Sequence, residues 1–340
     1  MANAAAVPIP SQLERPAPGF ASRVFGFLAT LARRKPMGFA GLLVIVVMVA
    51  IAIAPQLFDK HDPGKIVGDR HASYCFGPQD SFLCPVKTEA GLTVAGVEVT
   101  KGQTLTGSTS TPLGTDTLGR DVYSRLIWGT RVAVQVGFGA VVLSSFVALA
   151  IGVSSGYFRG MFDSVVQRFV DAVMAFPPLV VLLALPNMIG GATVWKLVMI
   201  LGILGGVGGS RVIRAAVLGM SSAQFIEAAR TIGATDLRIM ARHVVPNIFG
   251  PLMVQATIGL GGTILAESAL SFLGLGITQN DRPTWGYMLN LGQRVAIDHP
   301  WQAIWPGLAI AIAVFSFNMF GDALRDLLDP RLRGARGSFA

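Results

Sequence analysis

The most informative spacing of charged and small residues lies between residues 221 and 246, a polar stretch with apolar runs on both sides. Helix-forming residues lie on both sides of Gly233, and Thr235 or Asp236 can start a second helix. The pattern predicts two short helices around a glycine bend. Because this hairpin is too polar to insert among the apolar runs and too short to fold alone, the chemistry it offers is the non-covalent docking of a partner protein.

The first helix of the hairpin carries the residues expected to make that contact. Ala228 and Ala229 would keep the contact face shallow, and Glu227 and Arg230 would place charges at its rim. An ordinary solvated amphipathic helix is the alternative, and spacing alone does not exclude it. Pro246 then sets the start of the next apolar run.

Catalytic spacings are absent from the sequence. It contains no phosphate loop GxxxxGK[ST], no HExxH, no GxSxG and no paired-cysteine metal site, so the chain is predicted not to be an enzyme and to hold no cofactor or metal. His243, beside Arg242, is interpreted as a surface hydrogen-bonding residue rather than a pH switch or metal ligand. Cys75 and Cys84 lie in a long polar segment, where either a disulfide or two separate thiols is compatible with the sequence.

The chain is too apolar for a soluble protein of 340 residues, with 52% hydrophobic and 14% charged residues and a mean hydropathy of +0.59. A helix of about 20 apolar residues spans a bilayer. Five runs without charge are long enough to span: Pro36 to Phe58, Val132 to Phe158, Ala172 to Trp195, Val244 to Ala266 and Pro300 to Gly321. A sixth candidate, Leu197 to Ser210, is shorter and is bounded by Lys196 and Arg211, whose long side chains can reach the membrane interface.

These runs predict an all-α integral membrane protein with six transmembrane helices, one N-terminal anchor followed by a five-helix core. The net charge of +8 does not indicate nucleic-acid binding, because basic residues gather at the ends of apolar runs rather than on one polar face. Their distribution predicts that both termini are cytoplasmic. The core spans are expected at about 132–156, 168–188, 194–213, 246–268 and 302–321.

The same reading divides the chain into five regions. Residues 1–22 are predicted to be a disordered cytoplasmic tail, 23–58 the region of the first span, 59–130 an extracytoplasmic loop, 131–325 the transmembrane core with its docking loop at 221–246, and 326–340 a second cytoplasmic tail.

A few residues within the apolar runs are candidates for a translocation path. Pro177 and Pro178 are expected to kink or interrupt the third span of the chain, at about 168–188. Glu267 either caps a broken helix that lines the path or bonds a neighbouring helix. Asp171 is better explained by an ion pair with Arg168 than by a transport role.

The hairpin resembles the EAA loop of bacterial ABC importer permeases, with Glu227, Ala228, Ala229, Gly233 and Pro246 at the matching spacing. A histidine at position 243, where the general pattern often has isoleucine, is similar to the dipeptide, oligopeptide and nickel branch. Three further blocks also resemble that branch: Pro112 to Arg131, Glu267 to Gly276 and Phe317 to Arg333. The chain is similar to the second permease of the pair in these importers, which have the type I transmembrane fold.

The resemblance implies a subunit of an importer in the bacterial cytoplasmic (inner) membrane. Its partners would be a homologous permease, two ATPase subunits that bind ATP and Mg, and an extracytoplasmic solute-binding protein. The substrates would be di- or oligopeptides.

Three alternatives remain at this point. Nickel, glutathione or another small solute could replace peptides in the same architecture. A proton-coupled secondary carrier should show inverted repeats and mid-membrane ionisable residues, and no such repeat is found. A scaffold or channel without energy coupling would leave the hairpin without a partner.

Overall fold

A computed structural model of the chain describes residues 20–59, 63–64, 93–94, 97–98, 112–220, 224–277 and 282–328. Most of the predicted N-terminal tail, most of the extracytoplasmic loop, Cys75 and Cys84, and the C-terminal residues 329–340 lie outside the described residues. The elements follow from the N-terminus as α1 (Phe20–Arg34), α2 (Pro36–Ile53), α3 (Pro55–Phe58), β1 (Thr93–Val94), β2 (Val97–Glu98), α4 (Val122–Phe158), α5 (Gly160–Met174), α6 (Pro178–Met188), α7 (Val194–Met220), α8 (Gln224–Thr231), α9 (Asp236–Ile239), a π-helix (Met240–Val244), α10 (Val245–Asn247), α11 (Phe249–Phe272), α12 (Trp285–Gln293) and α13 (Trp301–Leu328).

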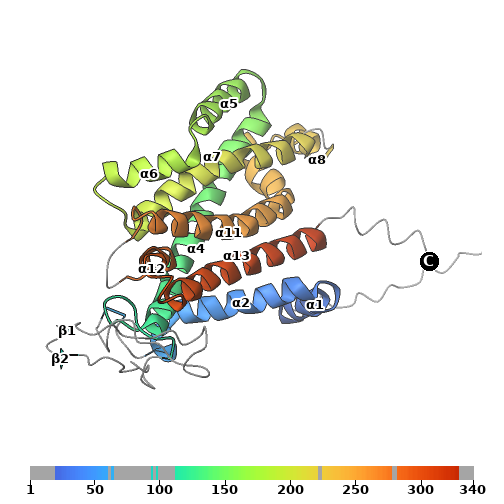
Figure 1. Ribbon diagram of the computed structural model, residues 1–340. Coiled ribbons are helices and arrows are strands. Elements are labelled where there is room, and N and C mark those ends of the chain that lie inside the picture. Colours follow the sequence, from blue (N-terminus) through green and yellow to red (C-terminus); the bar gives the residue numbers. More distant parts are fainter. Residues whose placement is uncertain are drawn as a thin grey trace, which may run out of the picture.

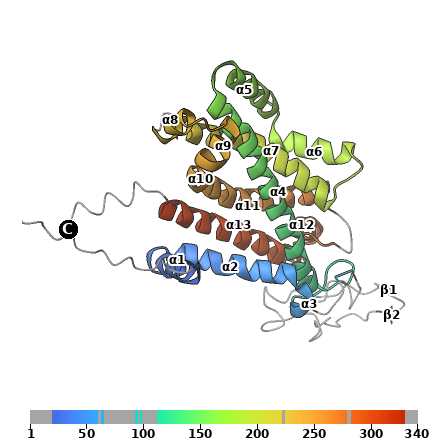
Figure 2. The same ribbon diagram turned by 180° about the vertical axis from the view of Figure 1, so that it is seen from behind.

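The predicted all-α membrane architecture is confirmed. Five helices are long and apolar enough to cross a bilayer, namely α2, α4, α7, α11 and α13, and the count becomes six if the bent pair α5 and α6 forms one span. The two strands pair as a minimal antiparallel hairpin, with Val94 opposite Val97. Helices α2, α13 and α11 run side by side, and α4 crosses them obliquely (Figures 1 and 2).

The third span of the chain, expected at 168–188 with a kink or an interruption at Pro177 and Pro178, is divided into two helices. The chain forms two helices there that are bent by 79° relative to each other. Pro178 is the first residue of α6, and Pro177 precedes it with an extended ψ of 126°. Proline has no N–H to continue the hydrogen-bond ladder and disfavours helical geometry in the residue before it. Helix α5 therefore ends at Met174, just before the two prolines, and α6 starts at the second of them. The interruption predicted at these prolines is therefore a complete break.

Helix α2 is held against α13 by glycines. A Cβ atom on Gly38 would overlap the Cβ of Ala323, and one on Gly41 would lie 2.6 Å from the carbonyl oxygen of Ser316. Small residues at these positions let the two backbones approach closely, as in other membrane helix pairs. The N-terminal anchor is thus a packed part of the bundle.

We expect Gly41→Ala to lower the unfolding temperature of the detergent-purified protein. The added methyl meets backbone, which cannot rotate away, and overpacking of this kind costs about 1–3 kcal/mol. Gly219→Ala is the matched control, because a Cβ there meets nothing within 4 Å. A midpoint for Gly41→Ala at or above that of the control would contradict this account of the α2 contact.

Candidate functional site

The predicted glycine bend is present between α8 and α9. Gly233 adopts φ +79°, a left-handed conformation that glycine accommodates without strain. Its N–H donates to the carbonyl of Arg230 at 2.9 Å, and the N–H of Ala234 donates to the carbonyl of Ala229 at 3.1 Å. This pair of hydrogen bonds is the Schellman motif, which ends a helix and turns the chain sharply. Gly233 therefore fixes the angle between the two halves of the hairpin.

The two alanines of the EAA-like sequence, Ala228 and Ala229, differ in exposure. Ala229 is 4% exposed and Ile226 2% exposed, and both belong to a core cluster with Ile213 and Val217 of α7. Ala228, in contrast, is exposed. The structure thus departs from the expectation that both alanines form the contact face. Only Ala228 is available to a partner, while Ala229 seats α8 on its own chain.

Tyr157, at the end of α4, ties the hairpin to the membrane helices. Its hydroxyl donates to Oδ1 of Asp236 at 2.7 Å, and the guanidinium carbon of Arg230 lies 5.2 Å from the centre of its ring. A hydrogen bond to Tyr157 raises the pKa of Arg230, which keeps that side chain cationic. Arg230 and Asp236, both predicted to be docking residues, are therefore held in place by a residue that sequence reasoning missed. The two bonded residues Tyr157 and Asp236 are far apart in sequence, so no local pattern signals the contact.

Two large apolar side chains project from the bend. Ile232 is 84% exposed and Leu237 is 74% exposed, one on each side of Gly233. Sequence reasoning missed both, although apolar residues inside an otherwise polar segment are a usable signal. Exposed apolar side chains beside charged Glu227 give this surface the composition of a protein contact, with an apolar centre and a polar rim.

The remaining predicted residues of the hairpin lie farther along the chain. Arg242 and His243 fall in the π-helix, where Arg242 is exposed and His243 partly exposed. Pro246 lies in α10 and is exposed. The π-helix and α10 lead from the hairpin into α11, so these three residues connect the docking surface to a membrane helix.

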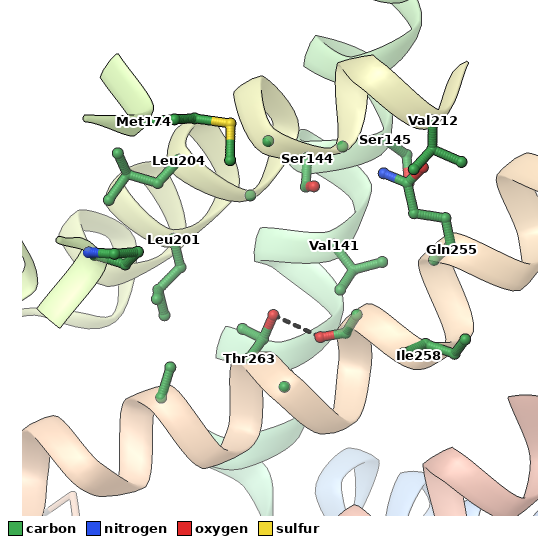
Figure 3. Close-up of a pocket in the computed structure, with 18 of the residues that line it drawn as sticks. Val141, Ser144, Ser145, Met174, Leu201, Leu204, Val212, Gln255, Ile258 and Thr263 are labelled. Carbon is green, nitrogen blue, oxygen red and sulfur yellow. Dashed lines mark hydrogen bonds between the residues drawn. The ribbon is translucent and has the colours of Figure 1, made fainter. Parts of the chain in front are cut away.

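A cavity of about 940 Å³ lies among α4, α5, α6, α7 and α11 (Figure 3). Pro178 lines it at the break before α6, directly after Pro177. Ala266 also lines it, but its neighbour Glu267 is 1% exposed and accepts hydrogen bonds from Ser271 at 2.8 Å and Ser268 at 3.4 Å. Glu267 lies inside the continuous helix α11, so within the described residues its carboxylate bonds its own helix.

Neither the cavity nor the hairpin presents a metal site. Among the described residues, no group of three or more His, Cys, Asp or Glu side chains is close enough to hold a metal ion. What the geometry offers is a partly apolar exposed surface at the hairpin and a mainly apolar cavity between the long helices.

Comparison with known proteins agrees with this arrangement. Residues 148–334 match the family described as binding-protein-dependent transport system inner membrane component. The chain is 37% identical over 212 residues to a dipeptide transport system permease protein of Alkalihalophilus pseudofirmus, covering 62% of this chain and 69% of the relative. It is 35% identical over 212 residues to a glutathione transport system permease protein of Pectobacterium atrosepticum, covering 62% of this chain and 70% of the relative. This multi-pass membrane chain therefore belongs to the family of binding-protein-dependent transport system inner membrane components.

Proposed function

We propose that this chain is a pore-forming permease subunit of an ATP-driven importer, and that it translocates di- or oligopeptides delivered by an extracytoplasmic binding protein. The observation that carries the proposal is the hairpin, in which exposed Ile232 and Leu237 flank a bend fixed by Gly233. Family membership and the peptide relatives support the same reading. The chain is the non-catalytic part of the assembly.

The proposed setting is the bacterial cytoplasmic membrane, with both termini inside. Helices α1 and α8 lie at one end of the bundle, and α3 and α12 lie at the other (Figures 1 and 2). The first end carries Arg33, Arg34 and Lys35, and basic residues favour the cytoplasmic side. The hairpin would then face the cytoplasm, where ATP is available.

The proposed partners are a homologous permease, two ATPase subunits that bind ATP and Mg, and the solute-binding protein. On the ATPase side, Ile232 and Leu237 would enter an apolar groove of one ATPase, Ala228 would allow close approach, and Glu227 would orient the contact from its rim. Arg230, Asp236, Arg242, His243 and Pro246 would hold the hairpin and pass its movement to α11.

Energy coupling follows from the contacts at the base of the hairpin. Closure of the ATPases on ATP would move α8 and α9, and Tyr157 would carry that movement into α4. Helix α4 also lines the cavity, through Val141, Ser144 and Ser145. The cavity would therefore switch between inward and outward states because ATP favours one of two packings of the same helices.

Tyr157→Phe tests this connection. The variant keeps the ring but loses the hydroxyl that bonds Asp236, a hydrogen bond that contributes about 1 kcal/mol. We expect peptide-stimulated ATPase activity of the whole complex to fall about fivefold, in line with that free energy. Tyr123→Phe is the control, since its hydroxyl donates to Phe58 O at the opposite end of the bundle. Equal activity of the two variants would remove Tyr157 from the coupling path.

The proposed function itself is tested by purifying this chain with its co-expressed neighbours. ATPase subunits should co-purify, and di- or oligopeptides with the binding protein should stimulate ATP hydrolysis and uptake in proteoliposomes. Stimulation by glutathione or nickel alone would keep the importer and change its substrate. Uptake driven by a proton gradient without ATP would favour a secondary carrier, and the absence of any nucleotide dependence would favour a scaffold or channel.

A further inference from the structure

The cavity among α4, α6, α7 and α11 is mainly apolar but contains one carboxamide with unmet hydrogen-bonding capacity. Oε1 of Gln255 is buried and has no hydrogen-bond partner among the described residues. Thr263, another polar side chain of the wall, is already used, since its hydroxyl donates to the Gly259 carbonyl at 2.8 Å (Figure 3). An unpaired buried carbonyl oxygen carries a free-energy cost, and a ligand would remove it once the carboxamide turns toward the cavity that Gln255 lines.

The space for this carboxamide is made by a glycine on the facing helix. Gln255 extends from α11 toward α7 (Figure 3), and a Cβ atom built on Gly209 would overlap Nε2 of Gln255. The next residue toward the N-terminus differs, because a Cβ on Gly208 meets only Met174, at an ordinary contact distance of 3.6 Å. Gly209 therefore accommodates Gln255, and Gly208 does not share that role.

We propose that Gln255 is a selectivity-determining residue of the translocation path and that its carboxamide hydrogen-bonds the backbone amide of a passing peptide. The inference rests on the proposed function, peptide import. It adds a substrate contact inside the membrane to the recognition performed by the binding protein.

The chemistry of a carboxamide suits this task. It offers both a donor and an acceptor, which are the complement of a peptide bond's carbonyl and N–H. It is also uncharged, so it neither selects nor repels peptides by the charge of their side chains. The surrounding wall is mainly apolar, with Ser144, Ser145, Thr263 and Arg325 as its other polar side chains. The volume of about 940 Å³ lies within the range of roughly 300–1,000 Å³ found for small-molecule sites. Peptides of varied sequence share only the backbone, which is what Gln255 can recognise.

The test uses proteoliposomes that contain the whole complex, with ATP inside and saturating binding protein outside. The probes are a labelled dipeptide and its depsipeptide, in which an ester replaces the peptide bond and removes the N–H donor. Wild type should import the dipeptide about tenfold faster than the depsipeptide at saturation, a difference equivalent to about 1.4 kcal/mol. In Gln255→Ala the preference should disappear, because dipeptide uptake falls to the depsipeptide rate.

Variants at the facing glycines separate a substrate contact from a structural effect. Gly209→Ala should displace the carboxamide and also abolish the preference, yet it should add nothing in a Gln255→Ala background, and Gly208→Ala should retain the wild-type preference. If Gln255→Ala keeps the preference, or lowers both uptake rates equally as loss of helix packing or permease pairing would, the inference fails while peptide import stands. If wild type imports neither probe although ATPase subunits are bound, the proposed function fails and takes the inference with it.

Discussion

Gly233→Pro is expected to reduce ATP-driven uptake to background while the chain still inserts and pairs with its partner permease. Proline is fixed near φ −65°, whereas position 233 requires φ +79°. Proline also lacks the N–H that donates to Arg230 in the motif that ends α8. The bend cannot form, and Ile232 and Leu237 lose the relative placement on which the proposed ATPase contact depends. Co-purification of the ATPase subunits and ATP-dependent peptide uptake measure the effect.

The chain contains a matched control for this change. Gly274, at the end of α11, also has φ +79°, and its N–H donates to Ser271 while Leu275 donates to Leu270. The motif is the same, but it lies at the opposite end of α11 from the hairpin. Gly274→Pro should therefore disturb local structure and retain the bound ATPases. Loss of ATPase binding in both variants would mean that docking depends on the overall fold rather than on the bend at Gly233.

Much of the fold could be predicted from sequence because a bilayer imposes a simple rule on helices. Four of the five charge-free runs lie largely in the observed helices α2, α4, α11 and α13, and the shorter sixth candidate lies in α7. The fifth run, 172–195, covers the end of α5 and all of α6. What the runs could not give was the geometry within them. The break at Pro177 and Pro178 was visible as a disturbance, but its 79° angle depends on the packing of α5 and α6 against their neighbours.

In the candidate site, too, features set by local sequence could be predicted, and features set by contacts between distant helices could not. Gly233 was predictable because the need for a left-handed residue is local, and the glycine in a helix-forming stretch indicates it directly. The inward orientation of Ala229 was not, because which side of a short helix is buried depends on α4 and α7. Tyr157 and Gln255 could not be found at all, since each acts through a residue on a distant helix, Asp236 and Gly209 respectively.

The block Pro112 to Arg131 resembled the family in sequence, but its structural role could not be predicted. In the structure it contains a buried ionic cluster around the start of α4. Asp116 accepts from Nε of Arg120 at 2.8 Å and lies 3.7 Å from Nε of Arg125, and both arginines are at most 2% exposed. Arg125 also donates to the carbonyl of Pro63 at 3.3 Å. Gln302 of α13 donates to the carbonyl of Thr115 at 3.0 Å. The block thus fastens the start of α4 to α13 and to Pro63.

Asp116→Asn is therefore expected to destabilise the protein strongly, because it removes a carboxylate charge that lies between two buried guanidinium groups. Removing one partner of a buried ion pair costs about 3–5 kcal/mol. The control is Asp171→Asn, at an ion pair of similar chemistry but high exposure. Asp171 lies 2.6 Å from Arg211, rather than pairing with Arg168 as the sequence suggested, and the two side chains are 53% and 45% exposed. Exposed pairs contribute about 0–1 kcal/mol.

Thermal unfolding of the purified complex compares the two variants directly. Asp116→Asn should lower the midpoint by several degrees or prevent assembly, and Asp171→Asn should leave it nearly unchanged, because only the first change removes a carboxylate charge from a buried ionic cluster. Added salt should not alter the loss in Asp116→Asn, since a buried pair is poorly screened. Equal midpoints would mean that water reaches Arg120 and Arg125 in the assembled protein. The segment before α4 would then be held chiefly by its uncharged contacts, such as the hydrogen bond from Gln302 to the Thr115 carbonyl.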